Sequence, residues 1–388
     1  SVNPQTAQRI QEYLRAAGYF TSNRAKTDYQ FGVPFTIWDD LGNRAHWRNR
    51  PDRSQPFFSV FNLEVTHESQ IFPSSPARKG KKLITDPAEI KVPPYYPDTP
   101  LVREELARMY DNIADMDAQV AEILEQLDED GLADNTIVFY WSDHGDGVPR
   151  AKRSLYDSGL RVPLMIRIPP QLGKPAAPGT VRNDLVSFVD LAPTVLALAG
   201  LVVPAHMQGR VLVGPGAGAP PAYVFGARDR MDAQYDMMRS ARDWRFLYIR
   251  NFSPELPYAG HIIYRNQSAI MQEWFRLQAE SALQGPPALW MRNSRPAEEL
   301  FDVQRDPHQI DNIAGDPAHR VTLEKMRSAV TGWMRTIGDQ GLNNEAEMIQ
   351  RMWPGGVQPV TAQPYIVRRK TPDVPERRPA IAAPAPTE

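Results

Sequence analysis

Apolar residues recur at helical spacing between residues 100 and 127. Pro100 suits the first turn of a helix, and Asp98 or Thr99 can cap that turn. Gly131 closes the segment. The pattern therefore predicts one long amphipathic helix. Its apolar stripe consists of Val102, Leu106, Tyr110, Ile113, Met116, Val120, Ile123, Leu124 and Leu127.

Short apolar runs occupy residues 57–65, 136–141 and 164–168, and a helical pattern covers residues 10–17 and 185–201. Such runs are typical of strands that are buried on both faces, as in a parallel sheet. Strands that alternate with helices favour the α/β class. We therefore predict a mainly parallel sheet flanked by helices.

The pattern changes after residue 221. Strands are predicted at residues 223–226 and 244–250, and helices at residues 271–283 and 323–337. These elements indicate a smaller α+β subdomain that follows the first domain.

We divide the chain into an α/β domain at residues 1–225, an α+β subdomain at residues 226–353 and a proline-rich tail at residues 354–388. Within the first domain, residues 21–29 are polar, and the pattern predicts a turn there.

The composition excludes several classes of function. The 388 residues carry 44 Lys+Arg and 46 Asp+Glu, a net charge of −2, which gives no basic footprint for nucleic acid or for an anionic membrane. No apolar run is long enough to span a membrane. The chain has no cysteine, which excludes disulfides, thiolate metal sites and a cysteine nucleophile among these residues. Nothing in the composition predicts an oligomeric state.

Polar residues follow two of the predicted strands. Asp143 and His144 come directly after one apolar run, and His67 ends another. Ligands of open α/β sheets bind beyond the carboxyl ends of the strands, and a carboxylate and an imidazole can both bind a metal ion. If the two strands run parallel, the three side chains share one edge of the sheet. Taken singly, each could instead cap a turn or pack in a loop.

Two lysines and one aspartate add to this picture. Lys26 lies in a polar loop, and Lys152 lies eight residues after His144. An isolated lysine is normally a solvated surface charge, but either lysine would serve as a point charge for an anionic group bound at the strand ends. Asp117 follows Ile113 by one helical turn, so we expect a buried carboxylate with a structural hydrogen bond.

Several ordered motifs resemble the sulfatase family of the alkaline-phosphatase-like superfamily. Together they span residues 14 to about 354. The loop Lys26-Thr27-Asp28 and the element at residues 298–302 are most similar to the heparan N-sulfatase-like branch. The motifs are TIVFYWSDHG (136–145), KRSLYDSGLRVPL (152–164), LRAAGY (14–19), PFF (56–58) leading to the candidate histidine, DLVSFVDLAPT (184–194) and ELFDVQRDP (299–307).

This resemblance implies an alkaline-phosphatase-like α/β fold and a hydrolase of sulfate esters or sulfamates. In such enzymes a formylglycine made from Cys or Ser attacks sulfur, and one divalent cation, usually calcium, holds the nucleophile and the sulfate oxygens. By position, Asp143 and His144 match metal ligands, and Lys26 and Lys152 match lysines that hold sulfate oxygens. His67 matches the histidine near the leaving group, a candidate proton donor.

The chain departs from the family pattern in two places that bear on the site. The common Lys-x-His loop is replaced here by Lys26-Thr27-Asp28. In addition, His144 stands where many members have Asn. Because a nitrogen ligand suits manganese or zinc better than calcium, we expect calcium and keep manganese as the alternative.

The nucleophile of the family has no counterpart before Leu14, and neither do its paired metal-binding aspartates. The string from Ser74 to Arg78 fits Cys/Ser-x-Pro-x-Arg, but it follows the histidine strand, and Lys79 to Lys82 do not continue it as an apolar helix. We therefore assign the nucleophile to none of these residues. The chain is expected to be a truncated form that is inactive and poorly stable alone.

Two other functions stay open. One is a phosphodiester or phosphonate monoester hydrolase of the same superfamily, and the other is a non-catalytic relative that retains an anion pocket. The resemblance also implies a small-molecule or saccharide sulfate as substrate and an exported protein, although no signal peptide lies within these residues.

Overall fold

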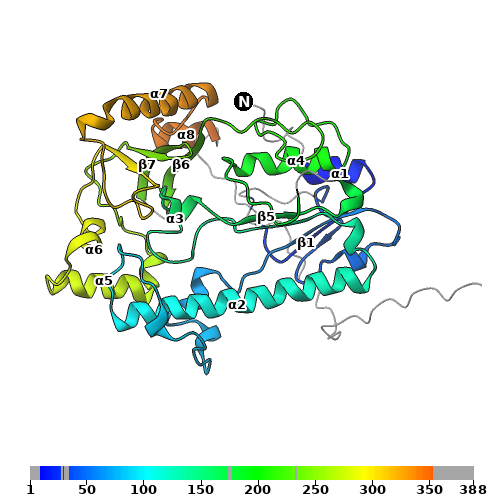
Figure 1. Cartoon of the computed structure of the whole chain (residues 1–388), viewed down its shortest axis with the longest axis horizontal. Helices are drawn as coiled ribbons and strands as arrows, with labels where there is room; N and C mark the ends of the chain where they lie inside the picture. The colour runs from blue at the N-terminus through cyan, green and yellow to red at the C-terminus, as the bar shows by residue number, and fades with distance from the viewer. Residues whose placement is uncertain (1–8, 28, 30–34, 174–176, 232–233, 353–388) are drawn as a thin grey trace, which may run out of the picture.

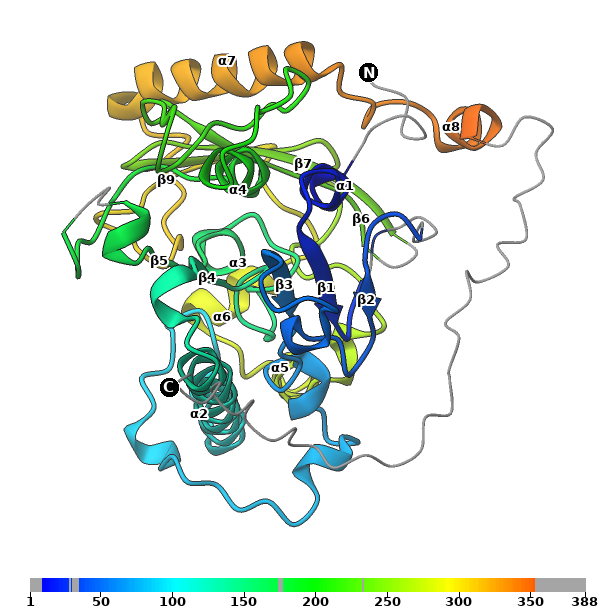
Figure 2. The same cartoon turned by 90° about the vertical axis from the view of Figure 1, so that its right-hand side faces the viewer.

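The computed structural model describes residues 9–27, 29, 35–173, 177–231 and 234–352. The helix α2 (Pro100–Glu129) runs along one side of the molecule, and α7 (Arg320–Ile337) covers the opposite side (Figures 1 and 2). Three sheets lie between them. The remaining helices are α1 (Ile10–Ala16), α3 (Asp157–Leu160), α4 (Leu191–Leu198), α5 (Ala269–Ala279), α6 (Gly285–Trp290) and α8 (Glu345–Met352).

A parallel sheet forms the first part of the fold. Its centre is β1 (Phe20–Arg24), which pairs in parallel with β2 (Asp40–Leu41) on one side and β3 (Phe57–Phe61) on the other. Next in the chain, β4 (Val138–Trp141) pairs antiparallel with β5 (Leu164–Arg167), and the long connection between them contains α3. The predicted α/β class is confirmed, with this β4–β5 pair running antiparallel.

The strand β1 lies in the segment where the polar pattern predicts a turn. That prediction is wrong for residues 21–24, whose buried polar side chains all have hydrogen-bond partners and are therefore compatible with a strand. Thr21 donates to the carbonyl of Ile37 at 3.0 Å, and the Ser22 and Ser59 hydroxyl oxygens lie 2.7 Å apart. The Asn23 carboxamide donates to a main-chain carbonyl at 2.8 Å.

The long helix α2 begins and ends where predicted. The Thr99 hydroxyl accepts from the main-chain amide of Val102, and Gly131 takes a positive φ of 66° just beyond the last turn. The predicted stripe is only partly buried, since Val102, Leu106 and Leu127 are buried whereas Tyr110 and Ile113 are exposed. We therefore correct the prediction for Asp117, which is also exposed.

Asp111 is one of two buried carboxylates of α2, the other being Glu105, and it lies six residues before Asp117. It accepts from the main-chain amides of Ile84 and Thr85, both at 2.9 Å, and from the Thr85 hydroxyl at 2.7 Å. Asp111 therefore anchors the irregular segment before α2, which is a structural role.

A four-stranded antiparallel sheet forms the C-terminal part, in the order β6 (Val224–Met231), β7 (Gln234–Arg242), β8 (Phe246–Asn251) and β9 (Glu298–Asp302). Leu155 and Tyr156, from the loop after β4, pack into its core with Met238. This packing fixes the loop that carries Lys152. The boundary at residue 225 stays a prediction, and the proline-rich tail lies outside the described residues.

Among the described residues, no helix is both long and apolar enough to cross a membrane.

Candidate active site

Two predicted site residues follow neighbouring parallel strands. Lys26 comes two residues after β1, and His67 comes six residues after β3. In the register of these strands Phe20 faces Phe57 and Arg24 faces Phe61, so both carboxyl ends lie at one edge of the sheet. Lys26 and His67 thus follow strands that end at the same edge of the sheet, whereas β4, which precedes Asp143 and His144, belongs to a different sheet from β3.

Lys152 reaches His67 from the loop after β4. Its Nζ atom lies 3.5 Å from the Nε2 atom of His67. Burial of the imidazole, together with the positive charges of Lys152 and Lys26, lowers the pKa of His67. The site is thus positively charged around a histidine that is neutral at neutral pH.

The orientation of the His67 ring follows from its other nitrogen. The main-chain amide of Ser69 donates to Nδ1 at 3.3 Å, and the Ser69 hydroxyl lies 2.8 Å from the same atom. These two contacts at Nδ1 fix the plane of the ring. The other ring nitrogen, Nε2, therefore faces the Lys152 ammonium.

Glu68 joins this site, and the sequence analysis missed it. Its buried carboxylate lies 2.9 Å from Lys152 Nζ and accepts two hydrogen bonds from Arg153, at 2.8 and 2.5 Å. Burial alone would raise its pKa, but the hydrogen bonds from Arg153 and Lys152 outweigh burial and lower it. The sequence contains one signal for this role of Glu68. The residue directly follows His67, and the loop after β4 carries Lys152 and Arg153 side by side.

Gly147 brings the two segments of the site together. A Cβ atom placed on it would lie 3.0 Å from both the main-chain nitrogen and the Cα atom of Glu68. The main-chain amide of Lys152 also donates to the carbonyl of Asp146 at 3.1 Å, which folds the loop back on itself. The loop thus presents Lys152 to Glu68 because glycine permits the close approach.

Asp143 and His144 lie together at the start of the same loop. His144 Nε2 is 3.6 Å from the Asp143 carboxylate, and its Nδ1 atom is 2.6 Å from the carbonyl of Gly145. Because a carbonyl only accepts, Nδ1 carries the proton and Nε2 keeps its lone pair beside Asp143. These two side chains could hold a metal ion, although the described residues contain no cluster of three or more His, Cys, Asp or Glu suited to one.

The segment from Ser74 to Arg78 has a different environment. Ser74 is exposed, Ser75 caps a single 3₁₀ turn, and Arg78 forms a bidentate pair with Glu105 of α2, at 2.8 and 3.0 Å. Arg78, the arginine of the Cys/Ser-x-Pro-x-Arg pattern, therefore binds the segment to α2.

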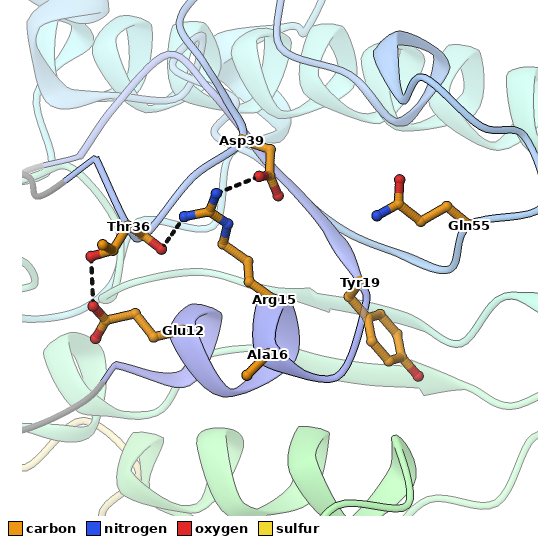
Figure 3. A pocket seen from close by; sticks show the side chains of 7 residues that line it. All are labelled: Glu12, Arg15, Ala16, Tyr19, Thr36, Asp39 and Gln55. Atoms are coloured by element: carbon orange, nitrogen blue, oxygen red, sulfur yellow. Dashed lines mark hydrogen bonds and ion pairs between the residues drawn. The ribbon is translucent and has the colours of Figure 1, made fainter.

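A polar cavity of about 460 Å³ lies near the other end of β1 (Figure 3). Its charged groups are paired within the cavity, since Arg15 contacts Asp39 at 2.6 Å and Glu12 accepts from Thr36 at 2.6 Å. The predicted site residues do not line this cavity. It therefore adds nothing to the chemistry at the carboxyl ends of the strands.

Known proteins that are similar to this chain are sulfatases. The family described as Sulfatase matches residues 22–201. An ulvan-active sulfatase of Formosa agariphila is 39% identical over 398 residues, covering 94% of this chain and 66% of the relative. The N-sulphoglucosamine sulphohydrolase of Homo sapiens is 29% identical over 265 residues, covering 64% of this chain and 51% of the relative.

A solved structure shares the fold. A protein in complex with its substrate D-glucosamine-2-N,6-O-disulfate superposes with a TM-score of 0.58 at 15% identity, covering 89% of this chain and 85% of that one. The chain spans about half to two thirds of the length of the two curated relatives. The ordered motifs, the family match and the fold lead to one conclusion: this chain belongs to the sulfatase family.

Proposed function

We propose that the whole protein hydrolyses a sulfate ester or a sulfamate of a saccharide. The observation that carries the proposal is the position of Lys152, whose ammonium lies 3.5 Å from His67 Nε2 and 2.9 Å from the Glu68 carboxylate. Sulfur–oxygen or sulfur–nitrogen cleavage builds negative charge on sulfate oxygens and on the leaving atom. A fixed ammonium stabilises the charge on the sulfate oxygens, and an adjacent proton donor neutralises the charge on the leaving atom.

The lysines and the histidine have separate roles in this proposal. Lys152 and Lys26 bind the sulfate oxygens, and His67 supplies a proton to the leaving oxygen or nitrogen through Nε2. The lowered pKa of His67 fits this role, because a bound sulfate anion offsets the lysine charges that lower it. His67 can then take up a proton once substrate is bound.

Sulfatases generally use a divalent metal ion. We propose Asp143 and His144 as two of its ligands, and the hydrogen bond from His144 Nδ1 to the Gly145 carbonyl supports this, since it leaves Nε2 as the ligand atom. The bound ion would neutralise charge on the sulfate oxygens. Calcium is the proposed ion, and the imidazole of His144 makes manganese the alternative.

The nucleophile is proposed to be a formylglycine in a part of the whole protein outside these residues. The 388 residues contain no cysteine, and the exposed turn of Ser74 offers no counterpart to a buried nucleophile. The chain is accordingly proposed to be a truncated form that is inactive alone. We also propose that the protein is exported, which cell fractionation tests.

The test compares sulfate with phosphonate chemistry on the whole protein. Purified enzyme is assayed with 4-nitrophenyl sulfate, with N-sulfated glucosamine and with a 4-nitrophenyl phosphonate monoester. We expect the better of the two sulfur substrates to exceed the phosphonate in kcat/KM by about 100-fold, because charge and geometry at sulfur set transition-state binding. The reverse ratio supports a phosphonate monoester hydrolase. No turnover, with sulfate binding retained, supports the non-catalytic relative.

Single substitutions then test the named residues. Lys152→Ala is expected to lower kcat/KM by about 100- to 1,000-fold, and His67→Ala by a similar factor, since each removes one group that stabilises the transition state. Lys81→Ala is the matched control, because Lys81 is a partly exposed lysine paired with Asp115. Equal activity of Lys152→Ala and Lys81→Ala would contradict the assignment.

A further inference from the structure

A small cavity is lined by Lys152 together with Arg228 and Met238 of the antiparallel sheet. Its volume is about 20 Å³, which is room for one water molecule or one ion. None of the described residues that line it is acidic. Its polar lining is dominated by six basic side chains: Arg150, Lys152, Arg153, Arg228, Arg265 and Arg295.

Fewer carboxylates pair with these basic side chains than there are basic side chains around the cavity. Glu68 pairs with Lys152 and Arg153, and Asp236 pairs with Arg228 at 3.2 Å and with Arg295. Two carboxylates therefore pair with four of the six cations, and the buried carboxylate of Glu299 also acts electrostatically on Arg150 and Arg295. Burying unbalanced charge costs several kcal/mol per ion, so such a cluster calls for a further anion.

Arg150 forms no ion pair with a carboxylate among the described residues. Its guanidinium is stacked between the rings of Tyr95 and Tyr156, with centroid distances of 4.2 and 4.1 Å, and it donates to the carbonyl of Gln309 at 2.6 Å. Its Nη1 atom is buried without a hydrogen-bond partner in the described part of the chain.

Two other arginines of the lining also have an unused donor. The Nε atoms of Arg228 and Arg295 are buried and make no hydrogen bond to any described residue, although the remaining nitrogens of both side chains are occupied. Burial lowers the pKa of Arg228, because removing its positive charge from water is unfavourable. Three of the arginines that line the cavity thus each have one buried guanidinium nitrogen without a described partner.

We propose that this cavity binds a single halide ion, chloride under physiological conditions. A monatomic anion fits the volume, accepts from several N–H donors at once and supplies the missing negative charge. The site is independent of the proposed hydrolysis, because it is defined by Arg150, Arg228 and Arg295, to which we assign no catalytic role. It would hold the Lys152 loop against the antiparallel sheet.

The direct test is diffraction from crystals of the whole protein grown in sodium bromide. Bromide scatters anomalously, and we expect an anomalous peak within hydrogen-bond distance of Arg150, Arg228 and Arg295. A cavity with a water molecule and no anomalous peak would overturn the proposal. This outcome is separate from the hydrolysis assay, so either proposal can fail alone.

Thermal unfolding gives a second readout. Replacing sodium gluconate by sodium chloride at equal ionic strength is expected to raise Tm by about 3 °C, because the ion binds only the folded state. Arg150→Gln should abolish this difference. Arg48→Gln is the matched control, since Arg48 is a buried arginine paired with Asp130 at 2.7 Å, and it should retain the chloride effect. Loss of the effect in both variants, or in neither, would count against the cavity as the site. If Arg150→Gln does not fold, the bromide peak decides.

Discussion

At the scale of single residues, Glu68 connects the two halves of the candidate site. A carboxylate buried to 3% exposure normally needs one cation, and this one has two, Lys152 and Arg153. The bidentate arginine fixes the carboxylate, and the carboxylate in turn fixes the ammonium next to His67. Glu68 is therefore a positioning residue: it acts on the substrate through Lys152 and not by contact.

The variant Glu68→Gln tests this role. Without the carboxylate, Lys152 loses its anchor, and we expect kcat/KM of the whole protein to fall by about 10- to 100-fold, mainly through kcat. The negative charge of Glu68 also raises the pKa of His67, so its removal should lower that pKa further. Activity that depends on protonated His67 declines as pH rises through this pKa, and the decline should shift to lower pH in the variant.

The matched control is Glu105→Gln. Glu105 is another buried carboxylate with a bidentate arginine, Arg78, but it lies on α2 away from Lys152. Both variants break a buried ion pair and should lose about 3–5 kcal/mol of stability. A shift of the pH profile in both variants, or in neither, would show that Glu68 has only a structural role. Partial recovery in Glu68→Asp would support the positioning role.

His46 gives a prediction about stability and pH. Its imidazole contacts the rings of Trp47 and Phe61, and burial lowers its pKa to about 4, well below the unfolded value near 6.5. The unfolded state therefore binds the proton first as pH falls. Stability contributed by neutral His46 is complete above pH 6.5, and about 3 kcal/mol of it is lost between pH 6.5 and pH 4.

Urea unfolding at pH 7 and at pH 4.5 measures this loss. The variant His46→Gln should show a smaller difference between the two pH values than the wild type does. His206→Gln serves as the control, since His206 is exposed. An unchanged difference in His46→Gln would assign the pH dependence to other groups, of which His67 is one, because its pKa is also lowered.

At the scale of elements, the loop between β4 and α3 is the part of the chain on which the candidate site depends. Gly147→Ala should push this loop away from Glu68, since the added Cβ meets main-chain atoms at 3.0 Å that cannot rotate away. We expect a loss of about 1–3 kcal/mol in stability and a lower kcat. The control is Gly332→Ala in α7, where a Cβ has open space and helix propensity predicts a gain of up to about 1 kcal/mol. Full activity of Gly147→Ala would refute this account of the loop.

The sequence pattern predicted elements with local signals and missed those held by partners distant in the chain. α2 carries its own cap at Thr99 and its own stop at Gly131, so both ends were predictable. The strand β7, in contrast, contains Arg239, a charged residue that periodicity excludes from a core. Its burial depends on Asp339, about 100 residues away, at 2.6 Å. No window of sequence contains that pair.

The candidate site shows the same division. His67 follows a strand that its apolar run predicted, whereas Lys26 follows β1, which the polar pattern did not predict as a strand. The contact between Lys152 and Glu68 could not be predicted either, because it depends on how the loop after β4 folds back. The error at Asp117 has a related cause: an amphipathic stripe of α2 drifts around the helix, and only the packed neighbours define the buried face, on which Asp111 lies.

At the scale of the whole molecule, the antiparallel sheet serves as a support for the candidate site. Leu155 and Tyr156 pack with Met238 in its core, and Arg228 of β6 donates to the carbonyl of Arg153 at 3.3 Å. The loop with Lys152 is thus held between the parallel sheet and the antiparallel one. The proposed halide ion lies at this junction, so its effect on Tm reports how firmly the two parts are joined.

The proposed metal site gives the last prediction, which concerns the whole protein. Oxygen ligands favour calcium and imidazole favours manganese, so the choice of ion should depend on His144. In His144→Asn an amide oxygen replaces the ring nitrogen. We expect the ratio of calcium to manganese affinity to rise by about 10-fold, and mass spectrometry of the metal content after equilibration with both ions measures it. His206→Asn, an exposed control, should leave the ratio unchanged. A ratio that does not respond to His144→Asn would remove His144 from the proposed ligands, whatever the hydrolytic activity of that variant.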